Sequence, residues 1–204
     1  MAPDNAIEWE TIHQPFEVDW WGNCCNTLGE EFKQLAYAKR MGLYFFHDGK
    51  SPYNIDAHNK SVIDIGGGPC SLLLKMRNLA LGLVVDPGHY SNWVYHRYDE
   101  AGITVLRVPA EELSVQGYDE ALIYNCLQHV IDPEKIIRNA KAAAKVIRIF
   151  EWIECGTSEG HPHELTQLTL NEWLGGYGQV GWVDENTARG RAYWGIFKGD
   201  SYAI

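Results

Sequence analysis

The chain has 204 residues, of which 46% are apolar and 22% charged, and 8 Trp, 11 Tyr and 6 Phe supply large side chains for a core. This length and composition predict one folded domain and exclude an intrinsically disordered chain. Lys and Arg number 17 against 27 Asp and Glu, which gives a formal net charge of -10. Because a negatively charged protein repels nucleic-acid phosphates, we expect no duplex nucleic acid among its partners.

The amino-terminal sequence MAPDNAIEWE has neither the basic nor the apolar region of a secretory signal, and no apolar run approaches the ~18 residues of a membrane span. We therefore expect a cytoplasmic protein with no membrane partner. An odd number of cysteines without the spacing of a disulfide framework indicates free thiols. These are Cys24, Cys25, Cys70, Cys126 and Cys155.

The first predicted helix begins at Thr27 and ends before Gly42, because Thr27 and Glu30 have the spacing of a capping box. Its apolar positions share one face, which we expect to be buried. They are Leu28, Phe32, Leu35 and Ala36.

From residue 61 onward, strand-like and helix-like runs alternate. Short apolar runs predict five strands, at residues 62–65, 83–86, 103–106, 121–125 and 146–150. The segments between them predict three helices, at residues 71–76, 91–101 and 132–144. Ser91 and Asp132 are the expected N-caps of the last two, and Pro133 takes a first helical position.

The carboxyl-terminal part adds a short helix with the capping-box pair Thr169 and Glu172, then strands at 179–183 and 192–197. The polar loop 184–191 between these strands predicts an antiparallel hairpin. The chain as a whole therefore predicts an α/β fold: a doubly wound, Rossmann-like, seven-stranded sheet, mostly parallel, with a C-terminal antiparallel hairpin. Ligands of such sheets bind outside the carboxyl ends of the strands.

A glycine turn and two acids stand at the carboxyl ends of the first two predicted strands. Gly66-Gly67-Gly68 permits a tight turn and a close approach of the backbone to a ligand. Asp86 ends the next strand twenty residues beyond Gly66, where an acid can bind the hydroxyls of a ribose. The dinucleotide pattern G-x-G-x-x-G fails at Ser71, and Asp64 before the glycines suits an ammonium group better than a pyrophosphate. These residues indicate a nucleoside ligand.

Together these motifs resemble those of the class I S-adenosylmethionine-dependent methyltransferases, over roughly residues 27 to 198. Residues 62–69 look like the motif at the methionine end of the cofactor, and residues 110–113 and 119–133 look like the adenine segment and the fourth-strand motif. Cys70 departs from the pattern, because many members have a third spaced glycine there. The resemblance implies S-adenosylmethionine as cofactor, bound by Asp64, Gly66, Gly67, Gly68, Asp86, Pro87, Ala110, Glu111, Asn125 and Leu127, with Asp64 acting directly or by holding the turn.

Three histidines are candidates for a general base, which a hydroxyl acceptor needs because its proton must leave. His129 follows the fourth strand, and His161 and His163 lie in the loop after the fifth. The spacing of these histidines and the nearby carboxylates matches no metal site, so we expect no metal. No Asn-Pro-Pro-Tyr segment stands after Tyr124, where the sequence reads Asn125-Cys126-Leu127-Gln128, and this disfavours methylation of nucleobase amino groups.

Residues 1–26 are predicted to form an acidic segment that covers the substrate, ahead of a methyltransferase domain at 27–204. Trp20 and Trp21 are typical of a pocket rim, although ordinary packing on the sheet edge is the alternative. Since no separate substrate domain fits in this length, we expect a small-molecule acceptor, with a hydroxyl or an amine. The alternative functions are a non-catalytic cofactor-binding partner subunit and a nicotinamide-dependent oxidoreductase.

Overall fold

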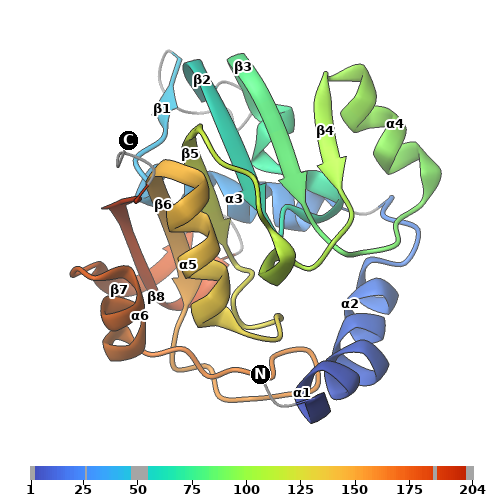
Figure 1. Cartoon of the computed structure of the whole chain (residues 1–204), viewed down its shortest axis with the longest axis vertical. Coiled ribbons are helices and arrows are strands. Elements are labelled where there is room, and N and C mark those ends of the chain that lie inside the picture. The colour runs from blue at the N-terminus through green and yellow to red at the C-terminus, as the bar shows by residue number, and fades with distance from the viewer. Residues whose placement is uncertain (1–2, 26, 47–54, 186–187, 201–204) are drawn as a thin grey trace.

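One mixed β-sheet is the centre of the computed structural model, which describes residues 3–25, 27–46, 55–185 and 188–200. The strand order is β4-β3-β2-β5-β6-β8-β7, and a short strand, β1, pairs with the start of β2 (Figure 1). Strands β4 to β6 in this order are parallel, and β8 and β7 add an antiparallel hairpin. The bounds are β1 Tyr44–Phe45, β2 Ile55–Ile65, β3 Met76–Val85, β4 Ile103–Leu106, β5 Tyr118–Tyr124, β6 Ala144–Trp152, β7 Gln179–Glu185 and β8 Ala188–Lys198.

The predicted fold class is confirmed, and β1 is an addition to the seven predicted strands. Both hairpin strands run further into the predicted loop 184–191 than expected, and residues 186–187 of that loop lie outside the described residues. Strands β2 and β3 also begin earlier than their apolar runs suggest, since polar residues interrupt the apolar ones in their first halves.

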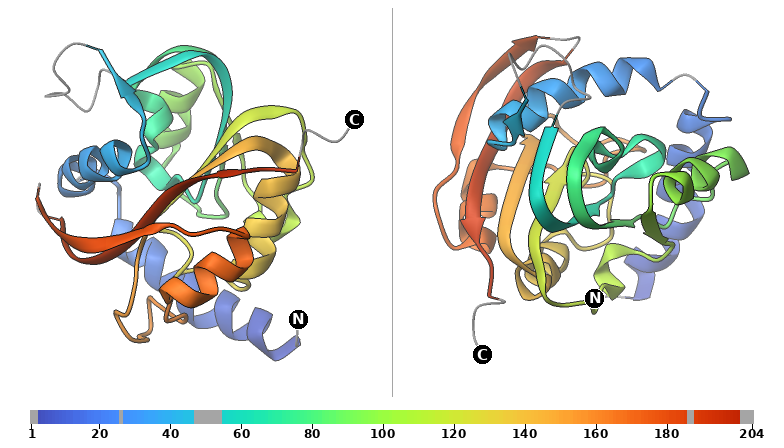
Figure 2. Two further views of the ribbon diagram at one scale, coloured as in Figure 1. Left: turned by 90° about the vertical axis from the view of Figure 1, so that its left-hand side faces the viewer. Right: turned by 90° about the horizontal axis from the view of Figure 1, so that it is seen from above.

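Helices cover both faces of the sheet, because alternate strand residues point to opposite sides and both sets are apolar. Ile63 and Ile65 pack into a core cluster with α5 and α6, whereas Val62 packs into a second cluster with α3 and α4. Figure 2 shows the helices on either side of the sheet. The helices are α3 Leu28–Arg40, α4 Asn92–Glu100, α5 Pro133–Ala143 and α6 Gln167–Leu174.

The helix predicted at 71–76 is wrong. Two short 3₁₀ turns, Gly68–Cys70 and Leu72–Lys75, lead directly into β3 at Met76. The amide of Ser71 donates to the Tyr98 hydroxyl at 2.9 Å, and the amide of Leu72 donates to the Tyr124 hydroxyl at 3.0 Å. Tyrosines from distant segments thus satisfy two buried amides at the start of this segment, which a helix beginning there would also have left without an intrahelical partner. Met76 already pairs with Ile55 on β2, so the chain is extended from that residue onward.

The first long helix, α3, departs from its prediction at its start and on its face. The Thr27 side chain accepts no capping bond, and its hydroxyl donates instead to Glu31 at 2.7 Å. Leu35 and Ala36 are buried as predicted, but Leu28 and Phe32 are 60% and 46% exposed. The buried residues are 34–38, in the second half of the helix, where Ala36, Tyr37 and Ala38 pack into the second core cluster.

Two other predicted helix starts are decided by their caps. Asp132 accepts a hydrogen bond from the amide of Lys135 at 2.9 Å, with Pro133 at the first helical position, as predicted. Helix α6 begins three residues earlier than expected, because Thr166 and Thr169 form the capping box. Ser91 is the N-cap residue of α4, although its side chain makes no capping bond.

The amino-terminal segment forms α1 Pro3–Glu8, a π-helical turn η1 Trp9–His13 and α2 Gln14–Trp21. In Figure 1 this helical segment lies at the side of the molecule toward which the arrows of β3 and β4 point. Within the described ranges, none of these or the other helices has the length and apolar character of a membrane span. All five cysteines are free thiols.

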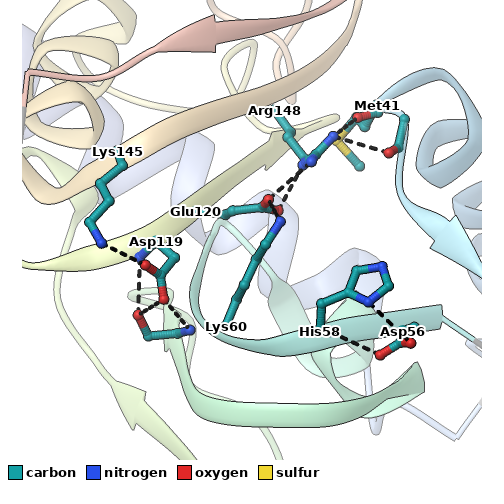
Figure 3. A network of polar contacts seen from close by, with 10 residues as sticks. Met41, Asp56, His58, Lys60, Asp119, Glu120, Lys145 and Arg148 are labelled. Atoms are coloured by element: carbon teal, nitrogen blue, oxygen red, sulfur yellow. Dashed lines mark hydrogen bonds and ion pairs between the residues drawn. The ribbon is translucent and has the colours of Figure 1, made fainter.

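A charged network lies at the start of β5, away from the carboxyl ends of the strands (Figure 3). Glu120 accepts hydrogen bonds from Arg148 Nε and Nη2 at 2.7 and 3.0 Å and from Lys60 Nζ at 2.5 Å. Arg148 also donates to the carbonyl of Met41 at 2.7 Å. Glu120 is 4% exposed, so its charge depends on these partners. The network joins the end of α3 to β2, β5 and β6.

Candidate functional site

A cavity of about 580 Å³ lies at the carboxyl ends of the parallel strands. The loops after β2, β3 and β5 contribute residues 66–68, 86–88 and 124–126 to its lining. Helix α3, the amino-terminal helices and the loop after β6 complete it. This is the position at which doubly wound sheets bind ligands.

The glycine turn after β2 presents bare backbone to the cavity. Gly66 and Gly68 have φ values of +71° and +57°, which residues with a Cβ rarely adopt. A Cβ on Gly66 would lie 2.5 Å from Cys126 Sγ, so the turn packs directly against the loop after β5. A Cβ on Gly68 would point toward Trp21 and Tyr90, 3.7 and 3.9 Å away. Gly66 is therefore required by close packing within the protein, whereas the missing side chain of Gly68 leaves room in the cavity.

Asp64, predicted to bind the cofactor, is fully buried and is not among the residues that line the cavity. Its Oδ2 accepts hydrogen bonds from the hydroxyls of Ser71 and Tyr124, the latter at 2.5 Å. Burial raises the pKa of Asp64 to about 7, although both hydrogen bonds act in the opposite direction. A Cβ on Gly67 would lie 3.0 Å from the Asp64 carboxyl carbon. These contacts support the glycine turn from within the protein.

Asp86 lines the cavity and joins the loops after β2 and β3. Its Oδ2 accepts from the amide of Gly68 at 3.0 Å, and its Oδ1 accepts from the Gly88 amide and the Tyr90 hydroxyl at 2.8 and 2.9 Å. Burial raises the pKa of Asp86, and these three hydrogen bonds oppose the shift. Because a carboxylate can accept about four hydrogen bonds, Oδ2 keeps one lone pair for a ligand. Pro87, beside it, also lines the cavity.

Of the other predicted cofactor residues, Asn125 lines the cavity, with a φ of +49°. Ala110, Glu111 and Leu127 do not line it. Glu111 Oε1 accepts from the amides of residues 131 and 132 at 2.9 and 3.0 Å, and the amide of Leu127 donates to the buried Glu151 at 3.1 Å. Carboxylates from two neighbouring elements thus hold the loop after β5. Burial raises the pKa of Glu151 to about 7, although the hydrogen bonds from the backbone amides lower it.

Two of the three predicted histidines meet at the cavity, and the third does not. His129 and His161 both line it, and their ring centroids are 4.6 Å apart. His163 Nε2 contacts the carbonyl of Val130 at 2.8 Å, and His163 is absent from the lining. A bridge between the backbones of Ser158 and His161 closes a short turn, which places Ser158, Gly160 and His161, but not His163, at the cavity.

The amino-terminal helices contact both loops that carry these histidines. Trp9 is 8% exposed, and its Nε1 donates to the carbonyl of His129 at 2.7 Å. Phe16 packs on Gly160 so closely that a Cβ on this glycine would lie 2.5 Å from the ring. The segment predicted to cover the substrate therefore forms part of the cavity wall, together with Trp20 and Trp21.

Sequence reasoning missed several lining residues. Glu17 on α2 contacts His129 Nδ1 at 2.9 Å, but in the sequence it is one of many acids in the same segment. Lys33 and Tyr37 on α3 also line the cavity, and their spacing of four residues on one helix is the only local signal for them. In the described part of the chain, no three His, Cys, Asp or Glu side chains are arranged to hold a metal ion.

The sheet order, the helical layers and the cavity at the strand ends define the class I S-adenosylmethionine-dependent methyltransferase fold. Solved structures carry this assignment, since no family sequence model and no curated protein matches the chain.

Three structures illustrate the likeness. Magnesium protoporphyrin IX methyltransferase from Synechocystis PCC 6803, with bound S-adenosylmethionine, is 13% identical, with a TM-score of 0.59 over 98% of this chain and 99% of that chain. A methyltransferase from Thermotoga maritima is 16% identical, with a TM-score of 0.56 over 94% and 95%. One from Aquifex aeolicus is 16% identical, with a TM-score of 0.52 over 83% and 98%. At such identities the likeness is one of fold.

Proposed function

We propose that this chain is a methyltransferase that uses S-adenosylmethionine and methylates a hydroxyl or an amine of a small molecule. One observation carries the proposal: the Gly66–Gly68 turn, Asp86 and two histidines line a single cavity at the carboxyl ends of a methyltransferase-type sheet. The turn supplies backbone without side chains, and Asp86 keeps a lone pair for a ribose hydroxyl.

The residues of this chain divide into those that touch the cofactor and those that shape its site. Asp86, Pro87 and Asn125 line the cavity with the glycine turn and are the proposed contacts. Asp64, Glu111 and Leu127 are proposed to act from behind the lining, through the bonds that hold the loops. Ala110, whose carbonyl accepts from Asn139 at 3.0 Å, shapes the same region.

When bound, S-adenosylmethionine supplies a methyl group on a positively charged sulfur, which leaves as a neutral thioether. The protein then has to orient the acceptor, exclude water and remove a proton where the acceptor is a hydroxyl. His161 is the proposed base, because it lines the cavity and His163 does not. Neighbouring aromatic side chains, Trp9, Phe16 and Trp152 among them, exclude water.

The size and cover of the cavity favour a small acceptor. Its volume of about 580 Å³ lies within the range of roughly 300–1,000 Å³ that small-molecule sites occupy. We propose that the amino-terminal helices act as a lid, since Trp9 and Phe16 contact both histidine-bearing loops.

The test has two stages. Melting curves with S-adenosylmethionine, S-adenosylhomocysteine and NADH should show stabilisation by the first two only. Mass spectrometry of a small-metabolite panel, incubated with methyl-labelled cofactor, should then reveal a labelled product. Stabilisation by NADH instead would point to an oxidoreductase, and binding without turnover on any metabolite would point to a non-catalytic partner subunit.

A further inference from the structure

One carboxylate of the amino-terminal segment reaches into the histidine pair of the cavity. Glu17 Oε1 lies 2.9 Å from His129 Nδ1, and the side chains of Glu17 and His129 are only 28% and 18% exposed. The same nitrogen lies 2.7 Å from the carbonyl of Gly160. Both neighbours of Nδ1 are acceptors, so this nitrogen carries a proton.

His161 is the next group in this chain of contacts. Its ring lies 4.6 Å from that of His129, centroid to centroid, and its Nδ1 lies 3.3 Å from the Ser158 hydroxyl. No carboxylate is paired with His161 among the described residues. Glu17, His129, Ser158 and His161 all line the cavity.

The charges around the pair favour opposite protonation states for the two rings. Burial by itself lowers the pKa of His129, but the hydrogen bond and charge of Glu17, the Gly160 carbonyl and the charge of Glu151 on β6 outweigh burial and raise it. Burial and the neighbouring charge of His129 lower the pKa of His161, and Glu17 opposes this only in part. Two adjacent imidazolium ions repel each other, whereas one charged and one neutral ring do not.

We propose that Glu17 is a positioning residue for proton transfer, holding His129 in its charged form beside His161 and thereby keeping His161 unprotonated and able to accept a proton. This role rests on the proposed methyl transfer to a hydroxyl acceptor. Because Glu17 belongs to α2, it holds His129 in the charged form, and His161 in the neutral form, only while the amino-terminal helices cover the cavity.

The step balances in charge and electrons. An oxygen lone pair of the acceptor forms the new bond to the methyl carbon, and the electrons of the broken carbon–sulfur bond return to sulfur. The hydroxyl proton moves to His161, so the positive charge that sulfur loses appears on the imidazole. The neighbouring charge of His129 then favours release of this proton to solvent, which restores the neutral base.

Histidine titrations by NMR, on the full chain without cofactor or acceptor, test the proposal. His129→Gln and His161→Gln assign the two resonances, each by its loss. In the unmodified chain, His129 should titrate above and His161 below the ordinary histidine value. Glu17→Gln should lower the His129 midpoint by about one pH unit or more, and the two midpoints should approach each other. Glu17→Asp should restore part of the separation.

Glu10→Gln is the matched control, because Glu10 is an exposed acid of the same segment and does not line the cavity. It should leave both midpoints in place. The proposal is overturned if Glu17→Gln leaves the separation unchanged, or if Glu10→Gln changes it equally. It is also overturned if Glu17→Gln and Glu17→Asp both release His129 to its ordinary value with fast amide exchange over residues 14–21, since Glu17 would then only hold the helix. Failure to bind S-adenosylmethionine would overturn the proposed function and leave these titrations informative.

Discussion

At the scale of single residues, the candidate site is built from buried polar groups that already have partners. Asp86 is held by two amides and a hydroxyl, and His129 by Glu17 and a carbonyl. Such groups are oriented before a ligand arrives, which lowers the cost of binding. Substitutions at these residues should therefore change binding and proton transfer more than they change folding.

Asp86→Asn should weaken S-adenosylmethionine binding by ~1.5–3 kcal/mol, about ten- to a hundredfold in Kd, because a charged acceptor for the ribose is lost. The amide is the preferred substitution, since it keeps the volume and its one remaining acceptor oxygen can still bind either the Gly68 amide or the Gly88 amide, which lie on different oxygens of Asp86. Isothermal calorimetry measures the affinity, with Asp99→Asn as the control on the exposed side of α4. An unchanged Kd in Asp86→Asn would contradict the assignment of this acid to the ribose.

The turnover of a hydroxyl acceptor should depend on pH through the protonation of His161, because only the neutral imidazole can accept the proton. Protonation disables His161, so turnover should fall about tenfold per pH unit below its lowered pKa, on the acid side of 6.5. Above its lowered pKa His161 stays unprotonated whether or not His129 keeps its proton, so turnover should reach a plateau on the alkaline side. Initial rates in His161→Ala should be ~100- to 10,000-fold lower and lack the acid limb. A flat profile would indicate an acceptor that needs no base.

At the scale of elements, the amino-terminal helices are anchored at three points to loops distant in sequence. Trp9 Nε1 donates to the carbonyl of His129, and His13 contacts the carbonyl of Glu159. After α2, the carbonyl of Asn23 accepts a hydrogen bond from Trp93 Nε1 at 3.0 Å. The Phe16 packing, the contact of Glu17 with His129 and the packing of Trp21 on the second core cluster add to these bonds, so opening of the segment breaks all of them.

Gly160→Ala should open the lid, because the new Cβ would lie 2.5 Å from the Phe16 ring. We expect amide exchange over residues 9–21 to become about tenfold faster or more, with little change in exchange in the central strands. Phe16→Ala combined with Gly160→Ala removes the clash and should restore slower exchange. If the double variant is no slower than Gly160→Ala alone, then the glycine does not act through Phe16.

At the scale of the whole molecule, one end of the sheet forms the candidate site and the other carries a buried charged network. The carboxyl ends surround the cavity, whereas the charged network around Glu120 joins α3 to three strands near the other end. Burial would raise the pKa of Glu120, but its bonds to Arg148 and Lys60 outweigh burial and lower it. A lowered pKa means that the native state stabilises the carboxylate relative to the unfolded chain.

Glu120→Gln should lower the free energy of unfolding by roughly 2 kcal/mol or more, because Arg148 and Lys60 lose their buried counter-charge. The stabilisation by Glu120 is complete above the ordinary pKa of 4.5 and is lost as the pH falls through the lowered native value. The difference between variant and parent should therefore shrink in acid, as urea unfolding at several pH values would measure. Glu134→Gln, which removes an exposed pair with Arg138, is the control and should change stability by less than about 0.5 kcal/mol.

Local signals in the sequence determined the order of the strands and motifs along the chain. They also identified many of the residues proposed to bind the cofactor. Apolar runs ended by glycines or acids identify the ends of β2 and β3, and therefore Gly66–Gly68 and Asp86, because strand period and turn chemistry act over a few residues. The Asp132 cap of α5 is equally local. The resemblance to the methyltransferases depends on these same segments.

Only the tertiary structure decided which side chains meet across the chain. Glu17 and His129 are 112 positions apart, and no local pattern in the sequence predicts their contact. His163 contacts the carbonyl of Val130 and does not line the cavity, and residues 71–76 do not form one helix because Met76 already pairs with Ile55 at the start of β3. In each case a contact between segments far apart in the sequence decides the outcome, because tertiary contacts override local propensity and are not contained in a local pattern.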